Sequence, residues 1–460
     1  MPPAVSPSTQ ESVDPKERRR AVWSSFLGAT VEYYDFLLYA AAAGLVFPKL
    51  FFNNLDETTG TTLSFLILLI GYIARPIGSV AFGHFGDRYG RKNVLVITLL
   101  TMGLVSVAIG FMPSSAAFPL APWLLVLLRA IQGVAVGGEW AGATLMTMEH
   151  SKQGNKGFGA SLAIAGGPAG AVLSTLVLSI FAKASGANFA NPEQYFVTDW
   201  GWRVPFLLSA CIVIFGLYLR SRVTESPEFE EARRRGDVHT GVPLVKMLRD
   251  SPKDLLLGTL AGMSGLFVQG LQASYMVPFI VRSTKDSDQP IERADALMML
   301  TIGSIIAIFV MPFLAWLSDK YGRRTVMISG GIVSIAGIWI VFHMIQTGDP
   351  SMVWAGMILM VCVVQPAQYG PIGAFLSEKF DAAHRYTGAG MTFQMASILG
   401  AGTAPLIANR IAPPGSSLDP IAWWVSGLFV ISSAAIYFSR ETAHRESHEE
   451  RFEETAVFKA

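Results

Sequence analysis

The chain of 460 residues is 51% hydrophobic and only 15% charged, and its mean hydropathy is +0.43. Soluble domains carry about a quarter charged residues, so this composition excludes an ordinary soluble protein and indicates a polytopic membrane protein. The formal net charge of only +1 gives no indication of a nucleic-acid partner or a polyanionic substrate.

The chain begins with a polar, proline-rich segment, residues 1–21, which ends in a cluster of basic side chains at Lys16, Arg18, Arg19 and Arg20. The apolar run that follows is too long for the hydrophobic core of a signal peptide and has no cleavage site. We therefore expect a cytoplasmic N-terminal tail that leads directly into the first membrane-spanning helix.

Twelve apolar stretches of about 20 residues follow, each long enough to cross a bilayer as an α-helix at about 1.5 Å per residue. The sequence thus predicts an all-α polytopic membrane protein with 12 transmembrane helices in two six-helix halves. The first six are expected near 22–46, 60–83, 93–112, 122–147, 158–182 and 203–220. The last six are expected near 255–281, 294–316, 325–345, 352–375, 385–410 and 421–438.

Polar segments divide the chain around these stretches. Residues 221–254 mix charges of both signs without an apolar run, which indicates a linker between an N-terminal half, 22–220, and a C-terminal half, 255–438. The tail 439–460 shows no sustained heptad pattern. Lys and Arg are abundant in the linker but absent from the connections at 112–122 and 346–351. This bias predicts a cell-membrane protein with both termini in the cytoplasm.

A short charged segment, GHFGDRYGRK at residues 83–92, recurs in degraded form as AWLSDKYGRR at residues 315–324. Subtracting 87 from 319 places the two aspartates 232 residues apart, about half the chain. Each copy carries three Lys or Arg and lies between two apolar stretches, so the repeat predicts a duplicated protein with parallel halves and two cytoplasmic loops. We expect these loops to control a gate through Gly83, Asp87, Arg88, Gly90, Arg91, Asp319, Gly322 and Arg323.

Charged side chains inside the apolar stretches need a reason, because one near the bilayer centre costs at least about 2.5 to 3.5 kcal/mol. Counting residues from the helix ends puts Asp35 and Arg129 at a similar depth near the midplane, where we expect them to pair. Glu32 is one turn from Asp35 on the same face, so one of the two carboxylates is expected to take up and release a proton. Arg75 and Glu139 are expected to form a structural ion pair nearer the cytoplasm.

Uncharged polar side chains recur at helical spacing near mid-depth in both halves, which favours a hydrated central cavity; the alternative is that they only tie helices together. The candidates for substrate contacts are Gln132, Gln269, Gln272, Tyr275, Gln365, Tyr369 and Gln394. Cys211 and Cys362 fall inside apolar stretches, and we find no metal-ligand spacing, nucleophile elbow or phosphate loop. The sequence therefore predicts no enzyme, no metal site and no cofactor.

The loop at 83–92 resembles the signature of the major facilitator superfamily, and its copy near Asp319 lies where that family has a second one. Five further stretches resemble the metabolite:proton symporter family within it: GATVEYYDFLLY, RAIQGVAVGGEW, GWRVPFLLS, ESPEF and RYTGAG. The opening region looks most similar to shikimate-type carriers. Tyr33 stands where the family usually has Trp, a change at the expected pocket wall, and Asp381 replaces a common Pro.

The resemblance implies a monomer in membrane lipid that imports a small carboxylate by alternating access. Our hypothesis is that protonation of Asp35 or Glu32 frees Arg129 to bind the substrate carboxylate. Shikimate, then 2-oxoglutarate or citrate, then a zwitterion such as betaine or proline are the substrates considered. Proton-coupled drug exporters have a fifth-helix motif in which Gly-Pro is followed, two residues on, by paired glycines. Here Gly167 and Pro168 are followed by Ala171 and Val172, which disfavours drug efflux. The remaining alternative is a membrane sensor that does not transport.

Overall fold

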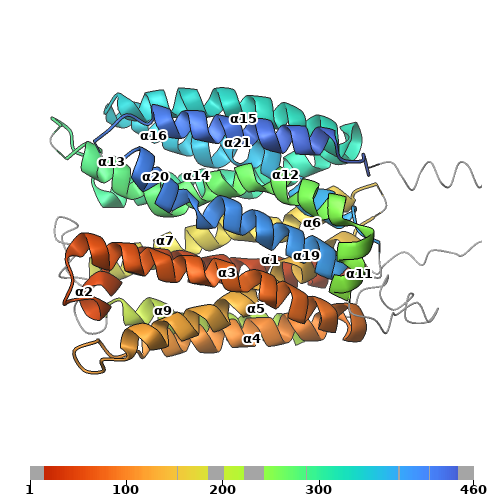
Figure 1. Ribbon diagram of the computed structural model, residues 1–460, viewed down its shortest axis with the longest axis horizontal. Helices are drawn as coiled ribbons and strands as arrows, with labels where there is room; N and C mark the ends of the chain where they lie inside the picture. The colour runs from red at the N-terminus through yellow and green to blue at the C-terminus, as the bar shows by residue number, and fades with distance from the viewer. Residues whose placement is uncertain are drawn as a thin grey trace, which may run out of the picture.

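The structure is a computed structural model of the chain, and it describes residues 15–152, 154–184, 201–221, 243–285, 287–381, 384–413 and 415–443. Helices account for the regular structure of these residues and lie side by side in one bundle (Figure 1). The tails 1–14 and 444–460 and most of the expected linker, 222–242, lie outside the described residues.

The first group of helices, which we call the N-terminal half, lies on one side of the bundle (Figure 1). Its helices are α1 (Pro15–Leu45), α2 (Phe47–Phe51), α3 (Glu57–Tyr89), α4 (Arg91–Gly110), α5 (Ala121–Glu149), α6 (Lys156–Ile164), α7 (Gly166–Ala184) and α9 (Arg203–Ser221).

The second group, the C-terminal half, lies on the other side and contains three π-helical segments, labelled η. It opens with α11 (Pro243–Asp250), α12 (Pro252–Gly270), η1 (Leu271–Met276), α13 (Val277–Ser283), α14 (Arg293–Tyr321) and α15 (Arg323–Gln346). It continues with α16 (Pro350–Leu359), η2 (Met360–Val364), α17 (Pro366–Tyr369), α18 (Ile372–Ser377), α19 (Arg385–Ser397), η3 (Ile398–Gly402), α20 (Ala404–Ile411) and α21 (Asp419–Tyr437).

Twelve membrane spans fit this element order. Ten are long and apolar enough to cross a bilayer within the described residues. The other two are α1, whose 31 residues include two buried carboxylates, and the apolar α9. Large apolar side chains such as Trp123, Phe309 and Trp423 are more than 70% exposed on the outside of the bundle, where lipid tails would cover them. The predicted all-α, 12-helix fold is therefore confirmed.

Two glycines form corresponding turns in the two halves. Gly90, with φ 102°, ends α3 and starts α4, and Gly322, with φ 94°, ends α14 and starts α15. Only glycine adopts this backbone conformation without steric strain. Their spacing, 322 minus 90, equals that of the two aspartates, so the repeated segment forms the same helix–turn–helix in both halves.

The three π-segments interrupt spans that face the centre of the bundle. In the tenth span the backbone N–H of Gln365 donates to the carbonyl of Met360, five residues back. Pro366 follows and has no backbone N–H of its own. A π-turn inserts one extra residue and shifts the helical face that follows it. The regular 3.6-residue spacing used to predict facing residues therefore fails beyond these points.

Candidate transport site

A small, partly open pocket lies between the two halves near the middle of the spans. Its lining comes from α1, α3, α12, α19 and η3: Glu32, Tyr33, Phe36, Tyr72, Arg75, Leu266, Gln269, Phe393, Ser397 and Ala401. Three predicted site residues, Glu32, Tyr33 and Gln269, are thus brought together, and Gln269 donates to the Tyr33 hydroxyl at 3.3 Å. Both halves contribute polar groups to one small cavity.

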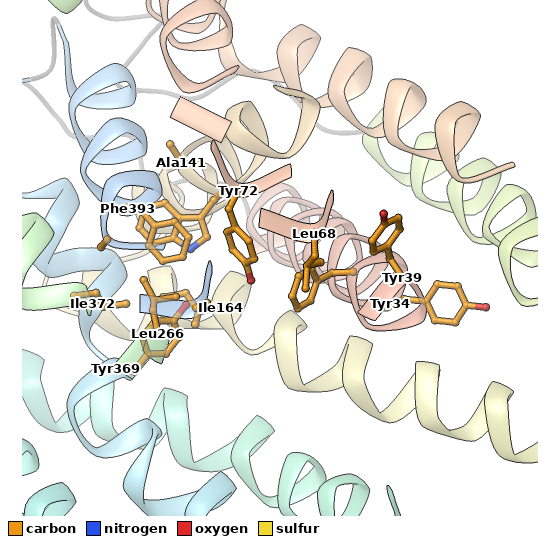
Figure 2. Close-up of a cluster of buried hydrophobic side chains, with 14 of the residues drawn as sticks. Tyr34, Tyr39, Leu68, Tyr72, Ala141, Ile164, Leu266, Tyr369, Ile372 and Phe393 are labelled. Carbon is orange, nitrogen blue, oxygen red and sulfur yellow. The ribbon is translucent and has the colours of Figure 1, made fainter. Parts of the chain in front are cut away.

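Aromatic and aliphatic side chains surround the pocket. Figure 2 shows Tyr72, Phe393, Leu266 and Tyr369 converging on the same central region from helices of both halves. Phe393 stacks on Trp140 of the N-terminal half with ring centroids 3.7 Å apart. Apolar walls with a few polar groups are typical of a small-molecule site.

Asp35 lies beside this pocket, inside the N-terminal half, and is fully buried. Its Oδ2 accepts a hydrogen bond from Ser106 of α4 at 2.7 Å, and its Oδ1 accepts one from Ser209 of α9 at 2.5 Å. Ser106 in turn accepts from Nε2 of Gln132 at 3.0 Å, and Oε1 of Gln132 accepts from Arg129 at 2.6 Å. We call this chain of side chains, Arg129, Gln132, Ser106, Asp35 and Ser209, the buried relay.

The expected direct pair of Asp35 with Arg129 is wrong. The two lie near each other, but no ion pair joins them among the residues that the structure describes, because Ser106 and Gln132 stand between them. The Arg129 guanidinium lies over the Tyr39 ring, 4.1 Å from its centroid, and the residue does not line the pocket. Arg129 and Gln132 therefore serve the relay and, in this structure, do not reach the cavity.

The expected ion pair of Arg75 with Glu139 is not found among the residues that the structure describes. Arg75 turns its backbone carbonyl towards α5, where a Cβ on Gly137 would lie 2.0 Å from that oxygen. Its guanidinium lies over the Tyr72 ring instead, 4.2 Å from the centroid, and faces the pocket. Matching depth does not fix the direction of a side chain, and that of Arg75 lines the pocket.

Several predicted polar residues tie helices together outside the pocket. Gln272 donates to the Met360 carbonyl at 2.9 Å, and the Tyr275 hydroxyl donates to the Ala412 carbonyl. Both contacts stay within the C-terminal half, which agrees with the alternative reading of such residues.

The other three polar candidates, Gln365, Tyr369 and Gln394, are buried and do not line the pocket. Gln394 is adjacent to Phe393 of the lining, and neither of its amide atoms has a hydrogen-bond partner among the described residues. A role of these three in binding substrate stays a prediction.

The two halves also meet at the end of the bundle where α1 begins and α21 ends, which we call the terminal end. Asp319 of α14 accepts hydrogen bonds from the backbone N–H groups of Gly157 and Phe158, both at 2.8 Å. These groups belong to the first turn of α6, where unpaired N–H groups and the helix dipole favour a negative charge. The predicted gate residue Asp319 thus bridges the halves.

An ion-pair cluster surrounds Arg323 at the same end. Arg323 pairs with Asp319 at 2.7 Å and with Glu378 at 2.9 Å, and Glu441, beyond α21, accepts from the Arg323 backbone N–H. Burial raises the pKa of the Glu441 carboxyl, but backbone N–H groups around it outweigh this and hold its pKa below its usual value. The side chains of Asp87, Arg88 and Arg91 lie outside those that the structure describes, so their part in the gate stays a prediction.

Sequence reasoning missed Ser106, Ser209, Glu378 and Glu441, and it did not place Arg75 at the pocket. Serines are common in membrane helices, and nothing in the spacing of Ser106 or Ser209 distinguishes them. Glu378 and Glu441 lie near helix ends, where acidic residues are ordinary.

The architecture and the buried charges are those of a membrane transporter, and comparison with known proteins assigns the family. Residues 25–405 match the Major Facilitator Superfamily. The chain is 35% identical to the shikimate transporter of Escherichia coli over 411 residues, which cover 85% of this chain and 87% of that one. The chain therefore belongs to the Major Facilitator Superfamily, and it is a multi-pass membrane protein and not an enzyme.

Other relatives support the same assignment. The chain is 33% identical to the inner membrane metabolite transport protein YhjE of E. coli, covering 95% of this chain and 97% of that one. It is 29% identical to a proline/betaine transporter of Salmonella typhimurium, covering 94% and 85%. Among solved structures, the proton:xylose symporter XylE superposes with a TM-score of 0.70 over 93% of this chain and 97% of that one, at 18% identity. At that identity the likeness to XylE shows the fold alone.

Proposed function

We propose that the protein is a proton-coupled symporter that imports a small carboxylate metabolite across the cell membrane by alternating access. The relatives named as shikimate and metabolite transporters support a metabolite substrate. The pocket between the halves supports a central binding site that the halves enclose from two sides. In this proposal the terminal end faces the cytoplasm, in line with the Lys and Arg bias of the connections.

The buried relay next to the pocket is the observation that carries the coupling part of the proposal. Two carboxylates lie one turn apart on α1: Glu32 lines the pocket and Asp35 belongs to the relay. A buried carboxylate in a membrane span marks a proton or ion pathway more often than a structural contact. We assign the coupling proton to this pair of side chains.

Proton-driven uptake into proteoliposomes tests the proposal. The wild-type protein should accumulate shikimate or another small carboxylate when the outside is acidic. Asp35→Asn should abolish this accumulation while preserving exchange of substrate across the bilayer, because the amide keeps the shape of the side chain and loses the proton site. The matched control is Asp295→Asn, an exposed aspartate in the first turn of α14.

The outcomes separate the alternatives. Full accumulation by Asp35→Asn would remove Asp35 from coupling. Wild-type uptake of betaine or proline without carboxylates would favour the osmolyte alternative, which the proline/betaine relatives suggest. Absence of any flux with the wild-type protein would leave the non-transporting sensor, and proton-driven export would favour efflux.

A further inference from the structure

We propose that Arg75 is the residue that binds the substrate carboxylate, and that the substrate is a small monocarboxylate with neutral polar groups. This inference rests on the proposed transport function and assigns the substrate contact within it. The sequence placed that contact at Arg129, and the geometry of the two arginines points to the other one.

Arg75 is a buried cation that faces the pocket without an acidic partner. Its side chain is only 8% exposed, and no carboxylate lies within ion-pair distance of it among the described residues. Its guanidinium is instead held between aromatic rings, 4.2 Å from the centroid of Tyr72 and 5.7 Å from that of Phe36. Cation–π contacts fix its orientation and leave the guanidinium without an ion pair among the described residues, so an anion in the pocket would gain a strong, charge-assisted contact.

Arg129 is also a buried cation beside aromatic rings, but it differs from Arg75 in its contacts. Its Nη1 donates to Gln132, its guanidinium lies over the Tyr39 ring, and it does not line the pocket. The choice between the two arginines therefore follows from which one faces the cavity.

The charges of the lining limit the substrate. Arg75 is the only Lys or Arg among the lining residues, and Glu32 is the only Asp or Glu. A monocarboxylate bound to Arg75 with a proton on Glu32 leaves the loaded pocket neutral, whereas a dicarboxylate or tricarboxylate would bury uncompensated negative charge. The charge balance favours one substrate carboxylate carried with one proton.

The aromatic rings argue against a quaternary ammonium substrate. Betaine-like cations are recognised by open aromatic faces. The Arg75 guanidinium already lies over the Tyr72 and Phe36 rings, so the faces that it covers are not open to a second cation. The Tyr33 hydroxyl, Gln269 and Ser397 instead offer hydrogen bonds to hydroxyl or carbonyl groups, and Leu266 and Phe393 offer an apolar wall.

The test compares shikimate with its methyl ester, which keeps the ring and hydroxyls and removes the negative charge. In proteoliposomes, the wild-type protein should transport the acid and prefer it to the ester. Arg75→Gln should remove this preference, and Arg75→Lys should raise KM for the acid by about 10- to 100-fold, because lysine cannot form the two-pronged contact. Arg129→Gln should retain the preference for the acid, and Arg410→Lys, at an exposed site, is the control for reconstitution.

Three results bear on the inference. Loss of the acid preference in Arg75→Gln alone supports it. Retention of the preference in Arg75→Gln together with its loss in Arg129→Gln overturns it and leaves the proposed function intact. Wild-type transport of betaine or citrate in preference to shikimate overturns the monocarboxylate assignment, and the wild-type response to a proton gradient tests the proposed function separately.

Discussion

Asp35 is held by two serine hydroxyls and not by a cation. Protonation of this carboxyl therefore breaks no ion pair, and Arg129 keeps its own contact with Gln132. In a direct pair, loss of the negative charge would leave a buried guanidinium uncompensated, which is strongly unfavourable. One serine and one amide between the two charges allow the carboxyl to change its protonation state at lower cost.

Ser106 links Asp35 to Gln132 within the buried relay. Ser106→Ala should lower the free energy of unfolding by about 1 to 3 kcal/mol, because Oδ2 of Asp35 and Nε2 of Gln132 both lose a buried partner. Thermal unfolding in detergent measures the loss. Ser329→Ala is the matched control, since that exposed serine bonds only to carbonyls of its own helix. Equal unfolding temperatures for the two variants would contradict the role of Ser106.

At the scale of single elements, the first turn of α6 holds the C-terminal half through Asp319. Asp319→Asn keeps the size of the side chain and removes the charge that the helix N-terminus favours. A carboxylate in that position contributes about 0.3 to 2 kcal/mol, so the population open at the terminal end should rise by about 2- to 30-fold.

Pulsed electron paramagnetic resonance measures this change. Spin labels at the exposed positions Lys152 and Lys253 report the distance between the halves at the terminal end. Asp295→Asn, at the opposite end of α14, should leave the distance distribution as in the wild type. An unchanged distribution in Asp319→Asn would show that the contact does not hold the gate.

Elements with a local signal were predictable from the sequence, whereas contacts across helices were not. The repeated segment predicted two corresponding loops, because glycine and charge patterns act locally, and the structure has corresponding turns there at Gly90 and Gly322. Residue counting placed Asp35 and Arg129 at one depth, but depth does not fix rotation about a helix axis. The rotation of each helix decides which residue faces the cavity, and Arg75 faces it while Arg129 does not.

The π-segments limited prediction in the C-terminal half. Gln269 and Gln272 were expected on one face of the seventh span, and only Gln269 lines the pocket. The π-segment η1 begins between them, at Leu271. No feature of the sequence indicated this extra residue, so Gln269 and Gln272 do not share the face that regular helical spacing predicts.

At the scale of the whole molecule, the halves touch on both sides of the pocket. On the side away from the terminal end, Thr175 of α7 and Thr301 of α14 share a hydrogen bond of 2.7 Å. Thr175 lies five residues beyond Gly170 on α7. Gly170 packs against Tyr33, which lines the pocket. With Asp319 closing the terminal end, the pocket lies between two contacts that alternating access requires to open in turn.

A cysteine pair tests this arrangement. Thr175→Cys with Thr301→Cys, in a protein with Cys211→Ser and Cys362→Ser, should form a disulfide under oxidation because the two side chains already touch. Proteoliposome uptake should fall to the level of empty liposomes and return after reduction. Each single cysteine variant is the control. Continued uptake by the fully cross-linked protein would show that this contact need not open.

The buried relay has a further consequence for how the cycle is timed. Its members come from α1, α4, α5 and α9, all within one half. When the halves move against each other as rigid bodies, the hydrogen bonds of the relay need not stretch or break. What changes around Asp35 and Glu32 is then their hydration, as water reaches the pocket first from one side of the membrane and then from the other. Water access, more than any rearrangement of the charges, would decide when the proton enters and leaves.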